Sequence, residues 1–472
     1  MNIKRMFKLI VVSGMALSWS LASLAQSAGA EHKELPPPGG PPKAFHLPQK
    51  EKFTLPNGLQ VTMVPYGHLP KVSIAVMVRA GALNEASGQV WISDLVGRMI
   101  KEGGTTSRSA EQVAQEAASM GGSIDVNAGE DQTEIALDVL SDFDVRAVAL
   151  LGDVVEHPLL PESDLARMKQ DAERRLAIAL SQSQPLAREQ FMKALYPDHP
   201  YGRVFPTQEM IAKYTIADVQ KFYKDNFGAA RTHIYVAGKF DEPAMKKAIT
   251  EAFSAWPNGP APLIEVPKPI SKREFSLIDR PKAAQSTVYV GLPTAYPGEE
   301  DYIPLSVTNT LLGGSFASRI TSNIREQKGY TYSPRSLLST RYHDAFWAEI
   351  ADVTTAVTGP SLKEIFYEIN RLQKEPPSEA ELKGIQDYIA GVFILANSSR
   401  QGIISQLAFA DLNNLGDDYL ETYVKKVYAV TPQQVQQMAE KYLSTDKMTI
   451  VVVGDKSKIA NQLAPYEHSS GQ

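Results

Sequence analysis

Few patterns of reactive side chains in this 472-residue chain match a known catalytic chemistry. There is no cysteine, which excludes a thiolate nucleophile and a thiolate metal ligand. No two of the eight histidines are three or four residues apart, the spacing that places two imidazoles on one helix face. A catalytic zinc site takes about three protein ligands. Only a zinc site assembled from histidines distant in sequence stays open. The histidines are His32, His46, His68, His157, His199, His233, His343 and His468.

Serine chemistry finds no support either. Ser315 follows Gly313 and Gly314, but no G-x-S-x-G nucleophile elbow occurs in the chain. The glycine pair is not a phosphate loop, because no Gly-Lys-Ser/Thr follows it. This stretch is typical of a helix end followed by the start of a new helix.

Arg325 and Tyr332 form the most promising pair. They are seven residues apart across Gly329, which suits a helix end, a turn and a strand and lets both side chains converge. A guanidinium carries a positive charge and a phenol is a neutral donor, so together they can stabilise a tetrahedral oxyanion. The alternative is a surface arginine beside a half-buried strand tyrosine.

Five sequence blocks, in order, resemble the pitrilysin or insulinase family of zinc peptidases along nearly the whole chain after residue 50. The blocks are LPNGLQV (55–61), RAGALNE (79–85), HPYG (199–202), LGGSFASR (312–319) and IREQKGYTY (324–332). The resemblance implies an α+β fold made of two homologous sandwich domains that face each other as a clamshell.

Where that family carries its inverted zinc motif H-x-x-E-H, this chain has Trp91, Asp94 and Leu95. The segment 90–100 still has helical periodicity, with Trp91 and Leu95 on one apolar stripe, and 103–104 can end the helix. We therefore interpret Trp91 and Leu95 as apolar filler of a former metal pocket. For the family's third ligand, a glutamate, the alignment leaves Glu173 and Ala177 open, and we assign no metal ligand.

The resemblance also implies roles for residues that remain. Arg325 and Tyr332 match a family pair that reaches the scissile carbonyl from the second domain. The strand edge near Asp125 and Val126, where the family has Asn-Ala, would add a substrate peptide by main-chain pairing. The chain thus resembles the Arg/Tyr-bearing subunit of a divided bacterial enzyme, not active alone, whose partner is a homologue that carries H-x-x-E-H and the zinc.

Two other readings stay open. A catalytically inert protein of the same fold would bind peptides or serve in assembly, as a homodimer or within a larger complex. A peptidase active by itself would need a metal site that the sequence does not show.

The N-terminus predicts export. Lys4, Arg5 and Lys8 precede an apolar run and the small residues that end at Ala25, as in a cleaved signal peptide. Removing these 25 residues changes the formal net charge from −5 to −8, because three positive and no negative charges leave. That balance argues against a nucleic-acid partner. We expect a soluble protein in the periplasm, with no membrane contact after cleavage.

An internal duplication underlies the predicted domains. Several residues recur at an offset of 216, among them Pro161 with Pro377, Thr215 with Thr431 and Gly238 with Gly454. Proline clusters mark the connections. The sequence therefore predicts a lead (26–50), an N-terminal peptidase-like domain (51–256), a linker (257–272) and a C-terminal domain (273–472).

Local patterns within the first copy indicate mixed α and β structure. Residues 72–78 alternate as a strand with one buried face, and Asn57-Gly58 indicates a hairpin turn. Residues 164–180 and 218–227 have helical spacing, and a strand is expected at 232–237.

Overall fold

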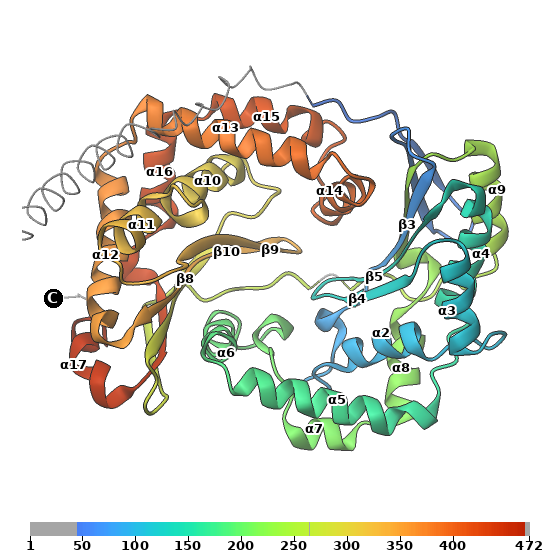
Figure 1. The fold of residues 1–472 in the computed structure, drawn as a ribbon, viewed down its shortest axis with the longest axis horizontal. Coiled ribbons are helices and arrows are strands. Elements are labelled where there is room, and N and C mark those ends of the chain that lie inside the picture. Colours follow the sequence, from blue (N-terminus) through green and yellow to red (C-terminus); the bar gives the residue numbers. More distant parts are fainter. Residues whose placement is uncertain (1–44, 264, 468–472) are drawn as a thin grey trace, which may run out of the picture. The chain divides into compact units, whose positions relative to one another are not determined.

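The computed structural model describes residues 45–263 and 265–467. The predicted signal peptide, residues 1–25, and the first part of the proline-rich lead lie outside the described residues. Two mixed sheets, each with its own helices, organise this part of the chain (Figure 1). None of the described helices has the length and apolar character needed to cross a membrane.

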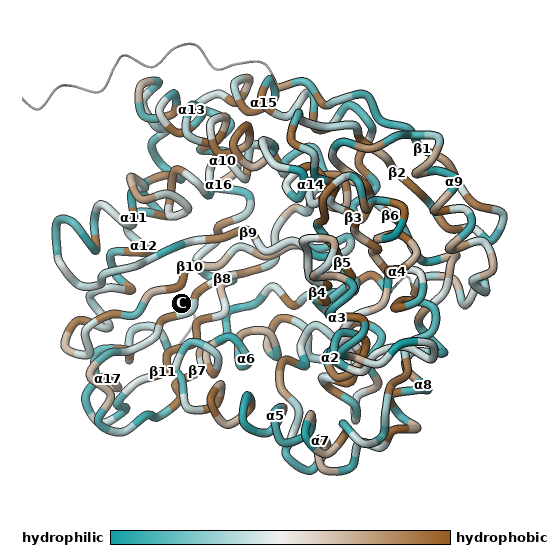
Figure 2. Tube along the Cα trace, turned by 45° about the vertical axis from the view of Figure 1, so that its right-hand side comes forward, coloured by the Kyte–Doolittle hydropathy of each residue, from teal (hydrophilic) through white to brown (hydrophobic). Residues whose placement is uncertain are grey.

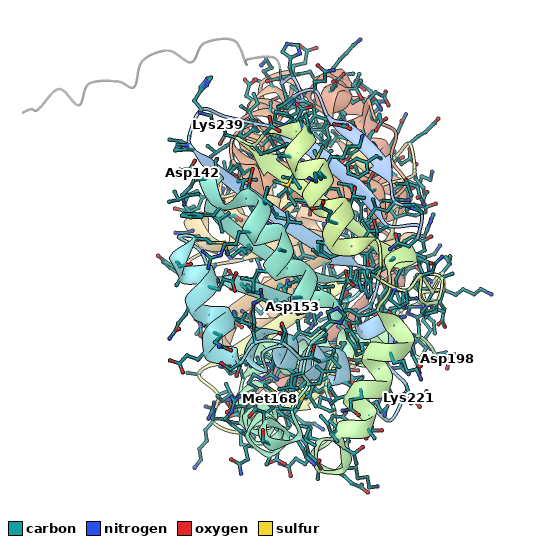
Figure 3. All side chains as sticks on the ribbon, turned by 90° about the vertical axis from the view of Figure 1, so that its right-hand side faces the viewer. Asp142, Asp153, Met168, Asp198, Lys221 and Lys239 are labelled. Atoms are coloured by element: carbon teal, nitrogen blue, oxygen red, sulfur yellow. The ribbon has the colours of Figure 1, made fainter. Side chains whose placement is uncertain are left out.

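The first sheet has six strands in the order β1-β2-β6-β3-β5-β4. The strands are β1 Glu51–Thr54, β2 Gln60–Pro65, β3 Lys71–Val78, β4 Ile124–Ala128, β5 Thr133–Leu140 and β6 Thr232–Gly238. The longer helices of this half are α2 Ile92–Glu102, α3 Ala110–Ser119, α4 Asp144–Glu156, α5 Glu162–Leu180, α6 Ser183–Leu195, α8 Ile216–Asn226 and α9 Glu242–Phe253. In Figure 3, α4 with Asp153 lies in front of the strands, next to α9. The predicted hairpin is confirmed, because Thr54 pairs with Gln60 around Asn57-Gly58.

The second sheet has five strands in the order β7-β11-β8-β10-β9. They are β7 Glu274–Asp279, β8 Gln285–Thr294, β9 Arg335–Arg341, β10 Asp344–Thr354 and β11 Thr449–Gly454. Its longer helices are α10 Tyr302–Asn309, α12 Thr358–Lys374, α13 Glu379–Ala396, α14 Arg400–Leu412, α15 Tyr419–Ala429, α16 Pro432–Tyr442 and α17 Lys456–Glu467. The short helices η5 Thr310–Gly314, α11 Arg319–Thr321 and η6 Ser322–Gln327 connect α10 to β9. The predicted α+β class is confirmed.

The repeat found in the sequence corresponds to equivalent elements. Helices α8 and α16 both begin after a threonine that caps them, Thr215 and Thr431, and both caps close a capping box. Each helix is followed by a strand that ends at a glycine, Gly238 or Gly454. The order β2-β6-β3-β5-β4 in the first sheet corresponds strand by strand to β7-β11-β8-β10-β9 in the second. Strand β1 is an additional edge strand of the first sheet.

Each half lends one helix to the other half's sheet. Helix α6 of the first half packs on β8 and β11, and α14 of the second half packs on β3 and β6 (Figure 1). The ring of Phe191 on α6 packs in a tilted arrangement against Tyr289 of β8, with ring centroids 4.5 Å apart. Leu407, 216 residues later, is buried in the core that α14 shares with the first sheet. Because α6 and α14 are equivalent in the repeat, the exchange is reciprocal.

This exchange corrects the prediction for residues 72–78. The strand was expected to bury one face, but every residue from Val72 to Val78 of β3 is buried. Val72, Ile74 and Val76 belong to the first core, while Ala75 and Met77 belong to the second. Figure 2 shows the apolar run along β3. A strand covered on both faces loses the alternation of exposure that one-sided burial produces.

A polar cluster accompanies each exchanged helix. On the first sheet, Asp138 of β5 accepts hydrogen bonds from Ser73 (2.5 Å) and from Arg400 of α14 (2.9 Å). Lys71 lies 3.1 Å from the same carboxylate. These donors lower the pKa of Asp138 against the opposing effect of burial.

The second sheet repeats the arrangement with a neutral donor. Asp352 of β10 accepts a hydrogen bond from Gln184 of α6 (2.6 Å) and one from Thr287. Gln184 stands 216 residues before Arg400. Both clusters have an aspartate that accepts a hydrogen bond from a hydroxyl group. The donor from the exchanged helix is a charged arginine in the first cluster and a neutral glutamine in the second.

Candidate functional site

The turn between η6 and β9 positions Arg325 and Tyr332. Helix η6 ends at Gln327, and Gly329 has a φ of +63°, a conformation that glycine adopts without strain. The next residues are then fixed to β10: Thr331 pairs with Val353 and donates its hydroxyl to the carbonyl of Asp352 at 2.7 Å. Tyr332 therefore follows a segment with a defined backbone.

The structure brings Arg325 and Tyr332 together. The guanidinium carbon of Arg325 lies 4.8 Å from the centroid of the Tyr332 ring and 4.4 Å from that of Phe316. Its Nε forms an ion pair with Glu326 at 3.1 Å. Such stacking holds a cation over the ring face while its other donors stay available.

The tyrosine is not part of a packed strand. Tyr332 is 79% exposed and precedes β9, so the alternative of a half-buried strand residue is wrong. Among the described residues, its hydroxyl has no hydrogen-bond partner. Phe316 is also exposed, at 65%, and sequence reasoning missed its contact with Arg325. Its position two residues after the helix end at Gly314 was the only available signal.

The segment in place of the zinc motif begins its helix later than predicted. Helix α2 starts at Ile92, and Trp91 has a φ of +72°, so Trp91 is not on the helical stripe. The reason is the carboxylate of Glu85, which accepts hydrogen bonds from the backbone amides of Trp91 and Ser93, both at 3.0 Å, and so caps the helix. Burial raises the pKa of Glu85 to about 7, although these hydrogen bonds oppose the shift.

Trp91, Asp94 and Leu95 each have structural partners. The indole nitrogen of Trp91 donates to the carbonyl of Val204 at 3.0 Å. Asp94 forms ion pairs with Arg98 at 3.0 Å and with Arg175 of α5 at 2.5 Å, and Arg175 also lies over the Trp91 ring at 5.0 Å. Leu95 is buried in the first core.

These residues do not fit a zinc ion. An indole N–H only donates, leucine has no ligand atom, and the single carboxylate is already paired with two guanidinium groups. Within residues 45–263 and 265–467, no cluster of three His, Cys, Asp or Glu could hold a metal.

Neither of the two α5 residues that could match the family's third zinc ligand is placed to bind a metal. Glu173 and Ala177 are both exposed, and the α5 residue that contacts Asp94 is Arg175, midway between them. Sequence reasoning missed Arg175. Helix α5 carries many charged residues, and the sequence does not indicate which of them faces another helix.

Strand β4, with Asp125 and Val126, lies at the edge of the first sheet and pairs only with β5. Asp125 is exposed and forms an ion pair with Lys101 at 3.0 Å. Both residues line a pocket of about 890 Å³ beside the start of α14. The edge has unpaired backbone groups that can accept an added strand.

Two family models match the chain. The insulinase (peptidase family M16) model matches residues 66–206, and the peptidase M16 inactive domain model matches residues 213–388. The chain belongs to the insulinase family of peptidases. The substituted zinc motif at Trp91, Asp94 and Leu95 fits the family's non-catalytic type.

Relatives and solved structures that resemble this chain cover most of its length. An uncharacterized zinc protease of Bacillus subtilis is 23% identical over 398 residues, covering 84% of this chain and 96% of the relative. One of Mycobacterium tuberculosis is 25% identical over 412 residues, covering 83% and 90%. A peptidase M16 inactive domain from Pseudomonas fluorescens superposes with a TM-score of 0.79 at 25% identity, covering 86% of this chain and 98% of that one. A protease from Helicobacter pylori gives a TM-score of 0.80 at 19% identity, covering 87% and 100%.

Proposed function

We propose that this chain is the non-catalytic subunit of an exported heterodimeric zinc metallopeptidase. In this proposal, the partner is an insulinase-family homologue that holds the zinc, and the heterodimer works in the periplasm. The observation that carries it is the contact between Arg325 and Tyr332, because a phenol that is 79% exposed and held over a guanidinium has no evident structural role.

The pair would act on the substrate carbonyl. During hydrolysis water adds to the carbonyl carbon, the C–N bond breaks and a proton passes to the leaving amine. Negative charge develops on the carbonyl oxygen, and donors placed there in advance stabilise it. Arg325 would supply charge and Tyr332 a neutral hydroxyl. The edge of β4 at Asp125 and Val126 would bind the peptide main chain.

The test is Tyr332→Phe in the heterodimer reconstituted with its zinc-bearing homologue. Loss of one such donor is expected to lower kcat by about 10² to 10³. Arg325→Lys keeps a charge but loses the planar fork, so it is also expected to slow turnover. Tyr367→Phe on α12 is the matched control, because this tyrosine is also exposed (54%). Wild-type kcat/KM for Tyr332→Phe would favour the alternative, an inert peptide-binding or assembly protein.

A further inference from the structure

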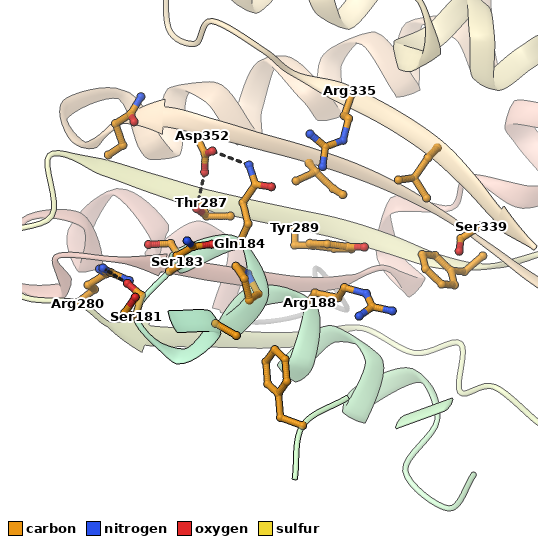
Figure 4. Close-up of a pocket in the computed structure, with 18 of the residues that line it drawn as sticks. Ser181, Ser183, Gln184, Arg188, Arg280, Thr287, Tyr289, Arg335, Ser339 and Asp352 are labelled. Carbon is orange, nitrogen blue, oxygen red and sulfur yellow. Dashed lines mark hydrogen bonds between the residues drawn. The ribbon is translucent and has the colours of Figure 1, made fainter. Parts of the chain in front are cut away.

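A second pocket lies on the other sheet, beside the edge strand β9 and the start of α6. It has a volume of about 870 Å³ (Figure 4). Its floor is apolar, formed by Tyr289, Leu337, Phe346 and Ile350. Polar side chains surround this floor, and Figure 4 shows Arg188, Arg335 and Asp352 among them.

The charge of this β9 pocket is positive. Four arginines line it, against two carboxylates, Glu130 and Asp352. Glu130 is shared by Arg188 at 2.8 Å and Arg341 at 2.6 Å. Arg280 and Arg335 form no ion pair within the described residues; Arg280 donates to the backbone carbonyl of Ser181. Neither guanidinium therefore has a salt bridge to a described carboxylate, unlike those of Arg188 and Arg341.

The start of α6 adds to this positive potential. Residues 181–185 line the pocket, and Gln182, at the N-cap position, makes no side-chain capping hydrogen bond. The first backbone amides of a helix have no partner within the helix, and the helix dipole favours negative charge there.

The equivalent pocket beside β4 has the opposite charge. Three carboxylates and one arginine line it, and the cap at the start of α14 is filled, because Ser399 accepts a hydrogen bond from Gly402. The carboxylates are Asp125, Glu134 and Asp138. The positive charge is thus particular to the β9 pocket and does not follow from the shared fold.

We infer that the β9 pocket binds an acidic segment of the peptide substrate, with Arg280 and Arg335 as the carboxylate-binding groups. Thr331 continues the pairing on β10, so Tyr332 lies only three residues before Arg335 on the same edge. A peptide bound there would have its acidic side chains in the pocket and its main chain near the Arg325–Tyr332 pair. This inference rests on the proposed function for its role in catalysis, but the binding itself does not.

The experiment measures binding to the mature chain alone by fluorescence anisotropy. The probes are a short peptide rich in glutamate and the same peptide with every glutamate replaced by glutamine. The acidic peptide is expected to bind about tenfold more tightly or better, since each charge-assisted hydrogen bond contributes about that factor. Added salt should reduce this difference.

Variants localise the site. Arg280→Gln with Arg335→Gln should weaken acidic-peptide binding about tenfold or more and leave the glutamine peptide unchanged. Arg146→Gln on α4 is the control, because its partner Glu116 keeps Arg108 at 2.9 Å. Equal binding of the two peptides, no binding of either, or wild-type binding by the double variant would overturn the inference. Because no partner is present, these results are independent of the Tyr332→Phe test.

Discussion

The two halves of the molecule share one plan but differ in the charges they place on it. In both, a strand aspartate, Asp138 or Asp352, joins the sheet to a helix lent by the other half. The donor from that helix is Arg400 in one cluster and Gln184 in the other. The first half surrounds its edge pocket with carboxylates, and the second surrounds its pocket with arginines. The difference shows that the same scaffold carries carboxylates at one sheet edge and arginines at the other.

The largest expected effect comes from breaking the helix exchange. Phe191→Ala should lower the free energy of unfolding by about 3–5 kcal/mol, and Leu407→Ala by about 2–5 kcal/mol, because each leaves a cavity in a fully packed contact. Hydrogen exchange measured on the strands should show Phe191→Ala exposing the amides of β8 and Leu407→Ala those of β3. Ile178→Ala, at a position that is 52% exposed, should change stability by less than about 0.5 kcal/mol. If each variant loosened only the sheet of its own half, the exchange would not couple the halves.

A smaller effect is expected from the carboxylates at the starts of α2 and α10, which should make stability depend on pH in opposite directions. The buried Glu85 caps α2, whereas Asp301, the N-cap residue of α10, makes no side-chain capping hydrogen bond and is paired with Lys441 at 2.5 Å. Burial raises the pKa of Glu85 from 4.5 to about 7, so its contribution is fully present below 4.5 and is lost as pH rises through 7. That loss amounts to about 3 kcal/mol.

Glu85→Gln should therefore flatten the pH dependence of the urea midpoint between about pH 5 and pH 8. The pH dependence that Asp301 contributes has the opposite sign. The hydrogen bond from Lys441 lowers the pKa of Asp301, so its contribution to stability is lost as pH falls below the usual range of a carboxylate. An unchanged slope in Glu85→Gln would mean that Glu85 does not titrate in this range.

The smallest effect tests the two polar clusters. Arg400→Gln makes the Asp138 cluster resemble that of Asp352 and should cost about 1 kcal/mol, because the carboxylate is 41% exposed and keeps Ser73 and Lys71. It should also bring the lowered pKa of Asp138 closer to its ordinary value, so that less stability is lost on acidification. Urea unfolding at neutral and acidic pH would measure both effects, and a comparison of low with high salt would isolate the charge contribution. A salt dependence equal to that of the wild type would show that the Arg400 charge contributes nothing.

Sequence reasoning predicted local elements well, because the signals for them are local. The hairpin at Asn57-Gly58, the helices at 162–180 and 216–226 and the strand at 232–238 appear close to their expected bounds. The 216-residue offset also corresponds to structurally equivalent helices, since both copies keep the same caps at Thr215 and Thr431.

What the sequence could not give depends on contacts between distant segments. The sequence does not show that α14 covers the first sheet, so the burial of both faces of β3 was missed. The late start of α2 arises because Glu85, six residues upstream of Trp91, takes the first amides. Arg175 and Phe316 gain their significance only from what they contact in space.

We propose that this chain holds no zinc and becomes part of an active peptidase only with a zinc-bearing partner. Metal analysis and peptidase assays on the purified mature chain, alone and co-expressed with an H-x-x-E-H homologue, test it most directly. We expect no stoichiometric zinc and no hydrolysis for the chain alone, and about one zinc per heterodimer with chelator-sensitive hydrolysis. About one zinc per chain with chelator-sensitive hydrolysis in the absence of any partner would contradict it.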